Sequence, residues 1–294
     1  MKRIYSIDFT RGLVMIIMAL DHVRDLMHVN SAVQSPTDLA TTTPLLFLTR
    51  WITHLCAPAF VFLAGTSAYL SFHRNNDITQ TRKFLLTRGL WLVLLEFTVV
   101  NLGLFFDLGF HTLMFEVIAA IGTGFIVLSL LLNLSSKAIG IIGLIILFCH
   151  NLLPPIPFLS PLYSVSVFPL SSSRVLTIAY PPVPWLGVML VGFASGRFFG
   201  PAENDRKKIF LKIGAAALLL FVLLRFSNIY GDPAPWSSQK TAVYTFLSFM
   251  NVTKYPPSLL FCLVTLGCMF LILAAGEHVK NRFTDFAYVY GKVR

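Results

Sequence analysis

Long hydrophobic runs, separated by short polar or proline-rich segments, dominate the pattern of this chain. Because a hydrocarbon core of about 30 Å needs about 20 apolar residues per helix, the pattern predicts eight membrane-spanning helices. There is no repeat of fixed period and no inverted half-and-half symmetry of the transporter kind. We therefore expect an all-α, polytopic bundle forming one domain over residues 1–294, with spans near residues 9–28, 45–72, 84–106, 112–133, 137–153, 183–199, 210–228 and 256–276.

The composition supports a membrane protein. Of the 294 residues, 56% are hydrophobic and 12% are charged, and the mean hydropathy is +0.74. Soluble domains have about 45–50% apolar and about 25% charged residues, so this chain has too little polar surface for a globule in water. A net charge of +10 would suggest nucleic acid in a soluble protein. In a membrane protein the positions of the charges must be considered first.

The basic residues predict the orientation. With a cytoplasmic N-terminus, the inside segments carry 17 of the 23 Lys and Arg residues, which is the bias of the positive-inside rule. These are Lys2, Arg3, Arg11, Arg74, Arg82, Lys83, Arg88, Lys137, Arg197, Arg206, Lys207, Lys208, Lys212, Lys280, Arg282, Lys292 and Arg294. The outside keeps Arg24, Arg50, Arg174, Arg225, Lys240 and Lys254. Nucleic acid is therefore not an expected partner. We expect Trp51, Trp185 and Trp236 at the outer headgroups.

The first span carries a polar stripe, so it is not a signal peptide. The spacing places its members on one helix face, with Asp21 beside that face. We expect an ion pair between Asp8 and Arg11 at the cytoplasmic edge. His22 with Asp21, near the outer surface, is a candidate for function. The stripe consists of Asp8, Arg11, Met15, Met18, His22 and Asp25.

The second span contains a histidine near mid-membrane. Arg50 and His54 are four residues apart, which predicts that they stack on one helix face. Pro58 frees a backbone carbonyl near position 54 and is expected to kink the helix. A charged or titratable group at this depth needs a partner or a wet cavity. His54 is therefore the stronger candidate for a functional histidine.

Two further carboxylates, Glu96 and Glu116, fall inside predicted spans. Either could pair with Arg88, Arg50 or a histidine, and the sequence does not choose among these partners. The cysteines lie in apolar runs and form no CxxC pair, so we expect buried free thiols rather than disulfides or a zinc site. They are Cys56, Cys149, Cys262 and Cys268.

Two outer segments are rich in Pro, Tyr and Trp. They are 180–187 and 230–258, the second running through Asn251-Val-Thr-Lys-Tyr-Pro-Pro-Ser258. Prolines restrict the backbone of such loops, and aromatic rings beside polar groups are typical of a sugar-binding floor. The candidate binding residues are Asp232, Trp236, Asn251, Lys254 and Tyr255. The alternative is a rigid connector in which Pro256 or Pro257 opens the last span.

Five motifs in order resemble the bacterial branch of the heparan-α-glucosaminide N-acetyltransferase catalytic-domain family. The likeness covers almost the whole chain. It comprises Ser6-Ile-Asp-Phe-Thr-Arg-Gly-Leu13 running into Met18-Ala-Leu-Asp-His22, Arg50-Trp-Ile-Thr-His-Leu-Cys-Ala-Pro-Ala-Phe-Val-Phe-Leu-Ala-Gly65, Glu116-Val-Ile-Ala-Ala-Ile-Gly122, Pro184-Trp-Leu-Gly-Val-Met-Leu190 and Asn251-Val-Thr-Lys-Tyr-Pro-Pro-Ser-Leu259.

Two features depart from the family pattern. In lysosomal members the catalytic histidine precedes the segment matching Ala57-Pro-Ala-Phe-Val-Phe62, and the corresponding position here, near Pro44, is not histidine. His54 and His22 are therefore the candidates. The family also continues past Tyr290-Gly291 into at least one more helix, so we expect this chain to be short at its C-terminus.

The resemblance implies a membrane acyltransferase of the bacterial inner membrane. It would move an acetyl or other acyl group from cytosolic acyl-coenzyme A, a co-substrate, to a sugar or glycan on the outer face. Arg11, Arg88 and Arg197 would meet the anionic donor. The base would be His54 first and His22 second, a role suited to imidazole, or the imidazole would itself carry the acyl group.

In the same hypothesis, Asp21 or Glu116 would orient the imidazole ring and Arg50 would stabilise the oxyanion. No tightly bound cofactor or metal is expected, and a homodimer is left open. The alternatives are a transporter or flippase for a glycan or lipid-linked sugar, and an inactive or structural relative. Coenzyme A binding discriminates the enzyme from the transporter.

Overall fold

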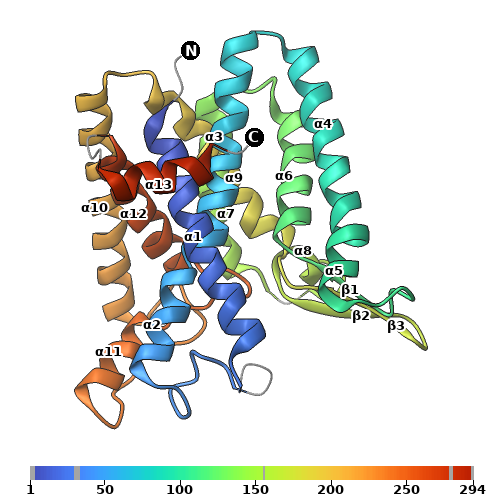
Figure 1. Ribbon diagram of the computed structural model, residues 1–294, viewed down its shortest axis with the longest axis vertical. Coiled ribbons are helices and arrows are strands. Elements are labelled where there is room, and N and C mark those ends of the chain that lie inside the picture. Colours follow the sequence, from blue (N-terminus) through green and yellow to red (C-terminus); the bar gives the residue numbers. More distant parts are fainter. Residues whose placement is uncertain (1–3, 30–33, 155, 278–280, 293–294) are drawn as a thin grey trace. The chain divides into compact units, whose positions relative to one another are not determined.

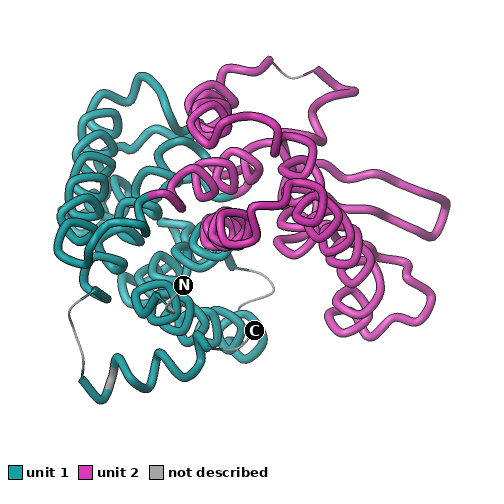
Figure 2. Tube along the Cα trace, turned by 90° about the horizontal axis from the view of Figure 1, so that it is seen from above, with its two compact units in different colours: residues 1–60, 198–254, 258–294 teal, residues 61–197, 255–257 magenta. Residues whose placement is uncertain are grey.

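The computed structural model describes residues 4–29, 34–154, 156–277 and 281–292. The predictions for Lys2, Arg3, Lys280 and Arg294 lie outside these residues. The chain forms two compact units: residues 1–60, 198–254 and 258–294 make the first, and residues 61–197 and 255–257 make the second (Figure 2).

The first unit is built around α1, α10 and α12 (Figure 1). Helix α12 packs against both α1 and α10, and it is the most buried of the three. Gly214 of α10 and Gly267 of α12 lie at their crossing, where a Cβ on Gly214 would come within 3.0 Å of the Gly267 carbonyl oxygen. The helices of this unit are α1 (Tyr5–Met27), α2 (Pro44–Thr53), α10 (Glu203–Ser227), α11 (Ala242–Met250), α12 (Leu259–Gly276) and α13 (Arg282–Gly291).

Helix α13 lies across α1 (Figure 1). Small residues permit this close approach: a Cβ on Gly12 would overlap the Ala287 carbonyl oxygen, and one on Gly291 would overlap the Asp8 carbonyl oxygen. The Tyr5 and Tyr288 rings stack with centroids 4.6 Å apart. The N-terminal third of α1 is thereby covered within the first unit.

The second unit contains the larger part of α3 (Cys56–Asn75), which packs on α9 through Gly65 and Gly192. Helix α4 packs on α6, and α9 packs on both α6 and α7. The other elements of the unit are α4 (Ile78–Leu95), the π-helix η1 (Glu96–Val100), α5 (Asn101–Phe105), α6 (Val117–Leu131), α7 (Ser136–Cys149), the 3₁₀ turn η2 (His150–Leu152), α8 (Ser160–Tyr163), α9 (Pro182–Ser195) and the 3₁₀ turn η3 (Gly196–Phe199), which runs into the first unit.

A small sheet interrupts the helical architecture of the second unit. Strand β1 (Thr112–Phe115) pairs in parallel with β3 (Arg174–Ile178), which pairs antiparallel with β2 (Ser166–Ser171). The Asn101 side chain accepts from the Met114 amide at 2.6 Å and donates to the Met114 carbonyl at 3.0 Å, so it completes the edge of β1. The all-α prediction missed this sheet. A short apolar run such as 112–115 cannot be assigned to helix or strand by periodicity alone.

Helices occupy all eight segments predicted as spans, so a mostly helical protein is confirmed. Five helical stretches are long and apolar enough to cross a membrane: Pro44–Asn75, Ile78–Phe105, Pro182–Phe199, Glu203–Ser227 and Leu259–Gly276. Helices α6 and α7 are shorter, and α1 carries charged side chains near both ends. The count of eight spans and the cytoplasmic N-terminus remain predictions.

Two predictions about single residue types are corrected in part. All four cysteines are free thiols, and Cys56 and Cys262 are buried, but Cys149 is exposed on α7. In a helix that crosses a membrane, an exposed apolar face meets lipid rather than water. Trp185 has no exposed surface and packs on Tyr180, so it does not sit at the headgroups.

Candidate functional site

The candidate site begins where the second predicted span is interrupted. Helix α2 ends at Thr53, His54 and Leu55 form a turn, and α3 starts at Cys56. Pro58 has no N–H to donate to the carbonyl of residue 54, which weakens the helix there. The predicted kink is confirmed. Arg50 lies in the last turn of α2 and His54 is the C-cap residue of that helix, so their stacking on one helix face remains a prediction.

The interruption holds His54 inside the first unit. Its side chain is buried, and its ring meets Phe261 of α12 edge-on at a centroid distance of 5.4 Å. Among the described residues its Nδ1 has no hydrogen-bond partner. The charges of Lys254, Arg50, Asp21 and Arg24 all act on this ring. His54 is thus a buried imidazole within electrostatic reach of four charged groups.

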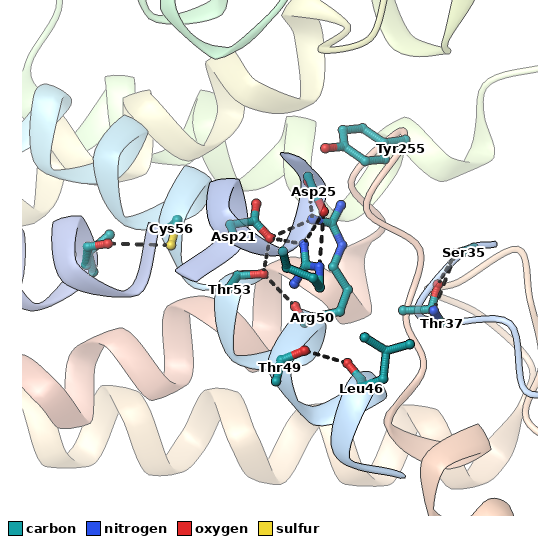
Figure 3. Close-up of polar contacts among 12 residues, drawn as sticks. Asp21, Asp25, Ser35, Thr37, Leu46, Thr49, Arg50, Thr53, Cys56 and Tyr255 are labelled. Carbon is teal, nitrogen blue, oxygen red and sulfur yellow. Dashed lines mark hydrogen bonds and ion pairs between the residues drawn. The ribbon is translucent and has the colours of Figure 1, made fainter. Parts of the chain in front are cut away.

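A network of hydrogen bonds joins α1 to α2 (Figure 3). Its centre is Oδ1 of Asp21, which accepts from Arg50 Nη1 at 2.8 Å, from Thr53 Oγ1 at 2.6 Å and from Arg24 Nη2. Arg24 also donates to Oδ1 of Asp25, from Nε at 3.0 Å and from Nη2 at 2.8 Å. We call Asp21, Arg24, Asp25, Arg50 and Thr53 the Asp21 network.

The network runs from the surface to the interior. The Asp25 side chain is 52% exposed, those of Asp21 and Arg50 are each 15% exposed, and that of Arg24 is 5% exposed. Cys56 anchors the start of α3 to α1 by donating from Sγ to the Val14 carbonyl at 3.6 Å.

Two adjacent candidate residues of α1, Asp21 and His22, have different environments. Asp21 faces α2, whereas the next residue, His22, is exposed. At the other end, Arg11 and Asp8 form the expected ion pair at 3.6 Å. Arg11 also donates to the Gly291 carbonyl at 3.3 Å. The helix thus carries one polar cluster at each end.

The remaining donor-binding candidates and Glu116 lie in the second unit. Arg88 is exposed on α4, with its guanidinium 5.8 Å from the Phe84 ring centroid. Arg197 is exposed in η3. Glu116 precedes α6 as its N-cap residue, in extended conformation, so its predicted place inside a helical span is wrong.

Glu96 has backbone partners. It lies fully buried in η1, and its Oε2 accepts from the Ala119 amide at 2.9 Å. The amide of Ile118 also interacts with this carboxyl. A carboxylate at the first turn of a helix satisfies amides that have no partner within the helix. The sequence left Arg88, Arg50 or a histidine open as the partner of Glu96, whereas the observed partners are backbone amides.

Segment 230–254 is held by buried polar contacts. Arg225, at the end of α10, donates to the carbonyls of Ala234, Ser248, Phe249 and Asn251. The Asp232 carboxylate accepts from the Thr253 amide, the Thr253 hydroxyl and the Ser258 hydroxyl at 2.6–2.9 Å. These contacts stabilise the backbone that leads to Lys254.

The proposed sugar-binding residues are not equally placed. The Trp236 ring packs against Phe226 and Phe249, and Asn251 donates to the Thr37 carbonyl at 3.1 Å. Lys254 is buried, and its charge acts on both Asp21 and His54. Of Trp236, Asn251 and Lys254, we therefore connect only Lys254 with the His54 site.

Tyr255 belongs to the second unit. Its ring meets Tyr180 edge-on at 5.5 Å, and the two hydroxyls lie 3.5 Å apart. Pro256 and Pro257 do not open the last span: α12 begins at Leu259, and Ser258 caps it by accepting from the Phe261 amide. The sequence predicted the position of this helix start to within a few residues.

Sequence reasoning missed Arg24 and Thr53 as members of the site. The spacing of Asp21 and Arg24, three residues apart, was the available signal for Arg24. It also missed an ion pair in which Arg206 donates to Glu277 from Nε at 2.8 Å and from Nη2, while Ser6 donates to the same carboxylate at 2.5 Å. These residues are far apart in sequence, so no local pattern reveals them.

Comparison with models of known protein families shows to which family the chain belongs. The family model described as heparan-alpha-glucosaminide N-acetyltransferase, catalytic, matches residues 3–228. The chain belongs to this family. A comparison with curated proteins gives no match. The heparan-alpha-glucosaminide N-acetyltransferase match includes the Asp21 network and His54 and ends before Asp232, so Asn251 and Lys254 lie beyond it.

Membership in the heparan-alpha-glucosaminide N-acetyltransferase family makes this chain an acyltransferase of a membrane family. Its apolar helices agree with an integral membrane protein. The described residues contain no group of three or more His, Cys, Asp or Glu side chains arranged to hold a metal ion.

Proposed function

We propose that this protein transfers an acetyl or similar acyl group from cytosolic acyl-coenzyme A to a sugar or glycan on the outer face of a bacterial inner membrane. The observation that carries the proposal is the buried His54 imidazole, whose Nδ1 has no hydrogen-bond partner among the described residues, beside the Asp21 network. An imidazole is suited to proton transfer near neutral pH.

In the proposed reaction, His54 Nδ1 takes the proton from an acceptor amine or hydroxyl. The acceptor nitrogen or oxygen attacks the thioester carbonyl carbon, a new C–N or C–O bond forms, and the C–S bond breaks. The proton then passes to the coenzyme A thiolate, which leaves as the thiol. Each step conserves atoms and electrons without a metal or a redox partner.

Arg50 is the proposed source of charge stabilisation. Its Nη1 is held by Asp21, and its side chain is only 15% exposed. A preorganised guanidinium in a water-poor site stabilises the oxyanion that forms as the thioester is attacked. Asp21 fixes Arg50 rather than touching the imidazole, so we assign Asp21 to positioning.

The donor is proposed to approach from the side of the N-terminus. Arg11, Arg88 and Arg197 belong to the basic set that the charge distribution predicts to be cytoplasmic. Coenzyme A carries phosphates that arginine binds well. The acceptor is proposed to approach from the side of Arg24 and Lys254, which belong to the opposite set.

The test is acetyl transfer from labelled acetyl-coenzyme A to glucosamine by membranes that contain the full chain. We expect His54→Ala to lower the rate by about 10²–10⁴-fold, the usual contribution of a general base. His22→Ala, on the exposed neighbouring position of α1, serves as the comparison. Near-normal rates in both variants would refute the proposal, and a loss confined to His22→Ala would move the base to His22.

Stabilisation of the solubilised protein by acetyl-coenzyme A separates this proposal from a transporter. A ligand that binds only the folded state raises the unfolding temperature, and the rise grows with the logarithm of the ligand concentration above Kd. We expect a concentration-dependent rise with acetyl-coenzyme A. A labelled acyl group that stays on the protein after denaturation, and is absent in His54→Ala, would show that the imidazole itself carries the acyl group.

A further inference from the structure

Arg24 is a buried cation with donors that the protein leaves unused. Its Nε and Nη2 bond to Asp21 and Asp25. Its Nη1 is buried and has no hydrogen-bond partner among the described residues. Leaving a buried donor without a partner costs about 1–3 kcal/mol, and more for a charged group. A guanidinium that faces this cost is well suited to an oxygen-rich ligand.

A second unused nitrogen occurs in the same cluster. His54 Nδ1 is also buried and unpartnered among the described residues. The Arg24 charge acts on the His54 ring, so the two groups lie within electrostatic reach. A ligand that accepted hydrogen bonds from Arg24 would therefore be held close to the proposed base.

The charge balance of the cluster favours an anion. Arg24 and Arg50 share the Asp21 carboxylate, and the other carboxylate in reach, Asp25, is 52% exposed and thus solvated. The charge of the buried Lys254 also acts on Asp21. Hydrogen bonds from a charged donor to a phosphate or carboxylate oxygen are stronger than neutral ones, and the Nη1 of Arg24 has two hydrogens to donate to such a group.

We infer that Arg24 binds an anionic oxygen group, a phosphate or a carboxylate, carried by the acceptor sugar. This inference rests on the proposed function and names the class of acceptor: a negatively charged sugar rather than a neutral one. Arg24 is an acceptor-binding residue that anchors the charged group of the sugar. The reacting amine or hydroxyl of that sugar is then directed toward His54.

The first experiment measures binding without catalysis. Thermal unfolding of the solubilised full chain is followed with glucose 6-phosphate, glucuronate, inorganic phosphate and glucose. We expect at least one charged sugar to raise the unfolding temperature, while glucose at the same concentration does not. Arg24→Gln abolishes the rise, and Arg174→Gln, at an exposed arginine of β3, keeps it. The sugar that binds identifies phosphate or carboxylate as the recognised group.

Three results of this experiment would overturn the inference: an equal rise with glucose, no rise with either charged sugar, or a rise that persists in Arg24→Gln. Inorganic phosphate alone supports the anion subsite if its effect is lost with Arg24. If Arg24→Gln does not fold, Arg24→Lys retains the charge but removes Nη1, the donor that has no partner among the described residues. Reduced stabilisation by the charged sugar in Arg24→Lys is then the expected result, and full stabilisation contradicts the inference.

The second experiment uses acyl transfer. Glucosamine and glucosamine 6-phosphate are compared as acceptors, with glucosaminuronic acid as the carboxylate counterpart. Arg24→Gln is expected to raise the KM for the preferred charged acceptor at least tenfold more than the KM for glucosamine. Equal effects on both acceptors contradict the inference while leaving the proposed function intact. No transfer to any acceptor by the unaltered chain contradicts the proposed function, and the binding experiment still tests the subsite.

Discussion

Arg50 donates from Nη1 to Oδ1 of Asp21 at 2.8 Å, although the two residues are 29 positions apart and lie on different helices. The same oxygen accepts from Arg24 and Thr53. A single carboxylate therefore fixes α2 against α1 at the point where the chain turns into the buried His54.

We expect Asp21→Asn to destabilise the protein, because Arg24 and Arg50 lose their shared counter-ion. Removing one partner of a buried pair costs about 3–5 kcal/mol. Thermal unfolding in detergent should show a clear fall in the midpoint. Asp25→Asn, at the half-exposed carboxylate, is the control, with an expected loss of about 1 kcal/mol or less. Equal losses in the two variants would contradict the central role of Asp21.

The buried pair of Arg206 and Glu277 gives a second stability prediction. Their side chains are 11% and 2% exposed, and Ser6 donates to the same carboxylate. Glu277→Ala leaves Arg206 without its counter-ion and should cost about 3–5 kcal/mol. The double variant Glu277→Leu with Arg206→Met should lose less, since neither charge then remains buried. A double variant less stable than either single one would refute this account.

The contact of α3 with α9 predicts that glycine-to-alanine substitutions differ in their effect on stability. A Cβ on Gly65 would overlap the Met189 carbonyl oxygen, and one on Gly192 would overlap that of Phe62. Gly65→Ala and Gly192→Ala should each destabilise by about 1–3 kcal/mol. Gly103→Ala is the matched control, because a Cβ there meets nothing within 4 Å. It should be neutral or stabilising by up to about 1 kcal/mol, as read by thermal unfolding.

Arg225 should control the order of segment 230–254, since it donates to four backbone carbonyls there. Lysine cannot reproduce this planar fork. We therefore expect Arg225→Lys to speed amide hydrogen exchange across residues 248–254 by at least tenfold. Arg174→Lys, in an exposed strand, should leave that segment unchanged. Unaltered exchange in Arg225→Lys would show that the segment is held by other contacts.

The loop after α5 should depend on pH. Asp107 accepts from the His111 amide at 2.7 Å and the Gly109 amide at 2.8 Å, and these bonds, that to His111 first, hold the pKa of this carboxyl below its ordinary value. A lowered pKa means that the stabilisation is complete above about pH 4, the ordinary value for Asp, and is lost as pH falls through the folded-state pKa.

The measurement for this loop is the protection of the Gly109 and His111 amides against hydrogen exchange, corrected for the intrinsic rate at each pH. We expect protection to fall below about pH 4 in the unaltered chain. Asp107→Asn should show lower protection at neutral pH and no further fall. A pH dependence retained in this variant would assign the effect to another group.

Local features of the site could be predicted from the sequence because they depend on neighbouring residues. Pro58 predicted the interruption at His54, since a missing N–H acts within one helical turn. Asp8 and Arg11 were expected to pair and do so. The short strand 112–115 was not predicted, because its pairing partner β3 lies about 60 residues further along the chain.

The sequence by itself determined that this protein is helical and lies in a membrane. Its long apolar runs with few charges leave too little polar surface for a soluble globule. It also yielded the short set of charged and titratable residues that includes Arg50 and His54. Only the tertiary structure decided which of them meet. Asp21 and His22 are adjacent in sequence, yet rotation by one residue around α1 directs Asp21 to Arg50 and leaves His22 exposed. The packing of α1 against α2 selects between them, and that packing depends on contacts between distant residues.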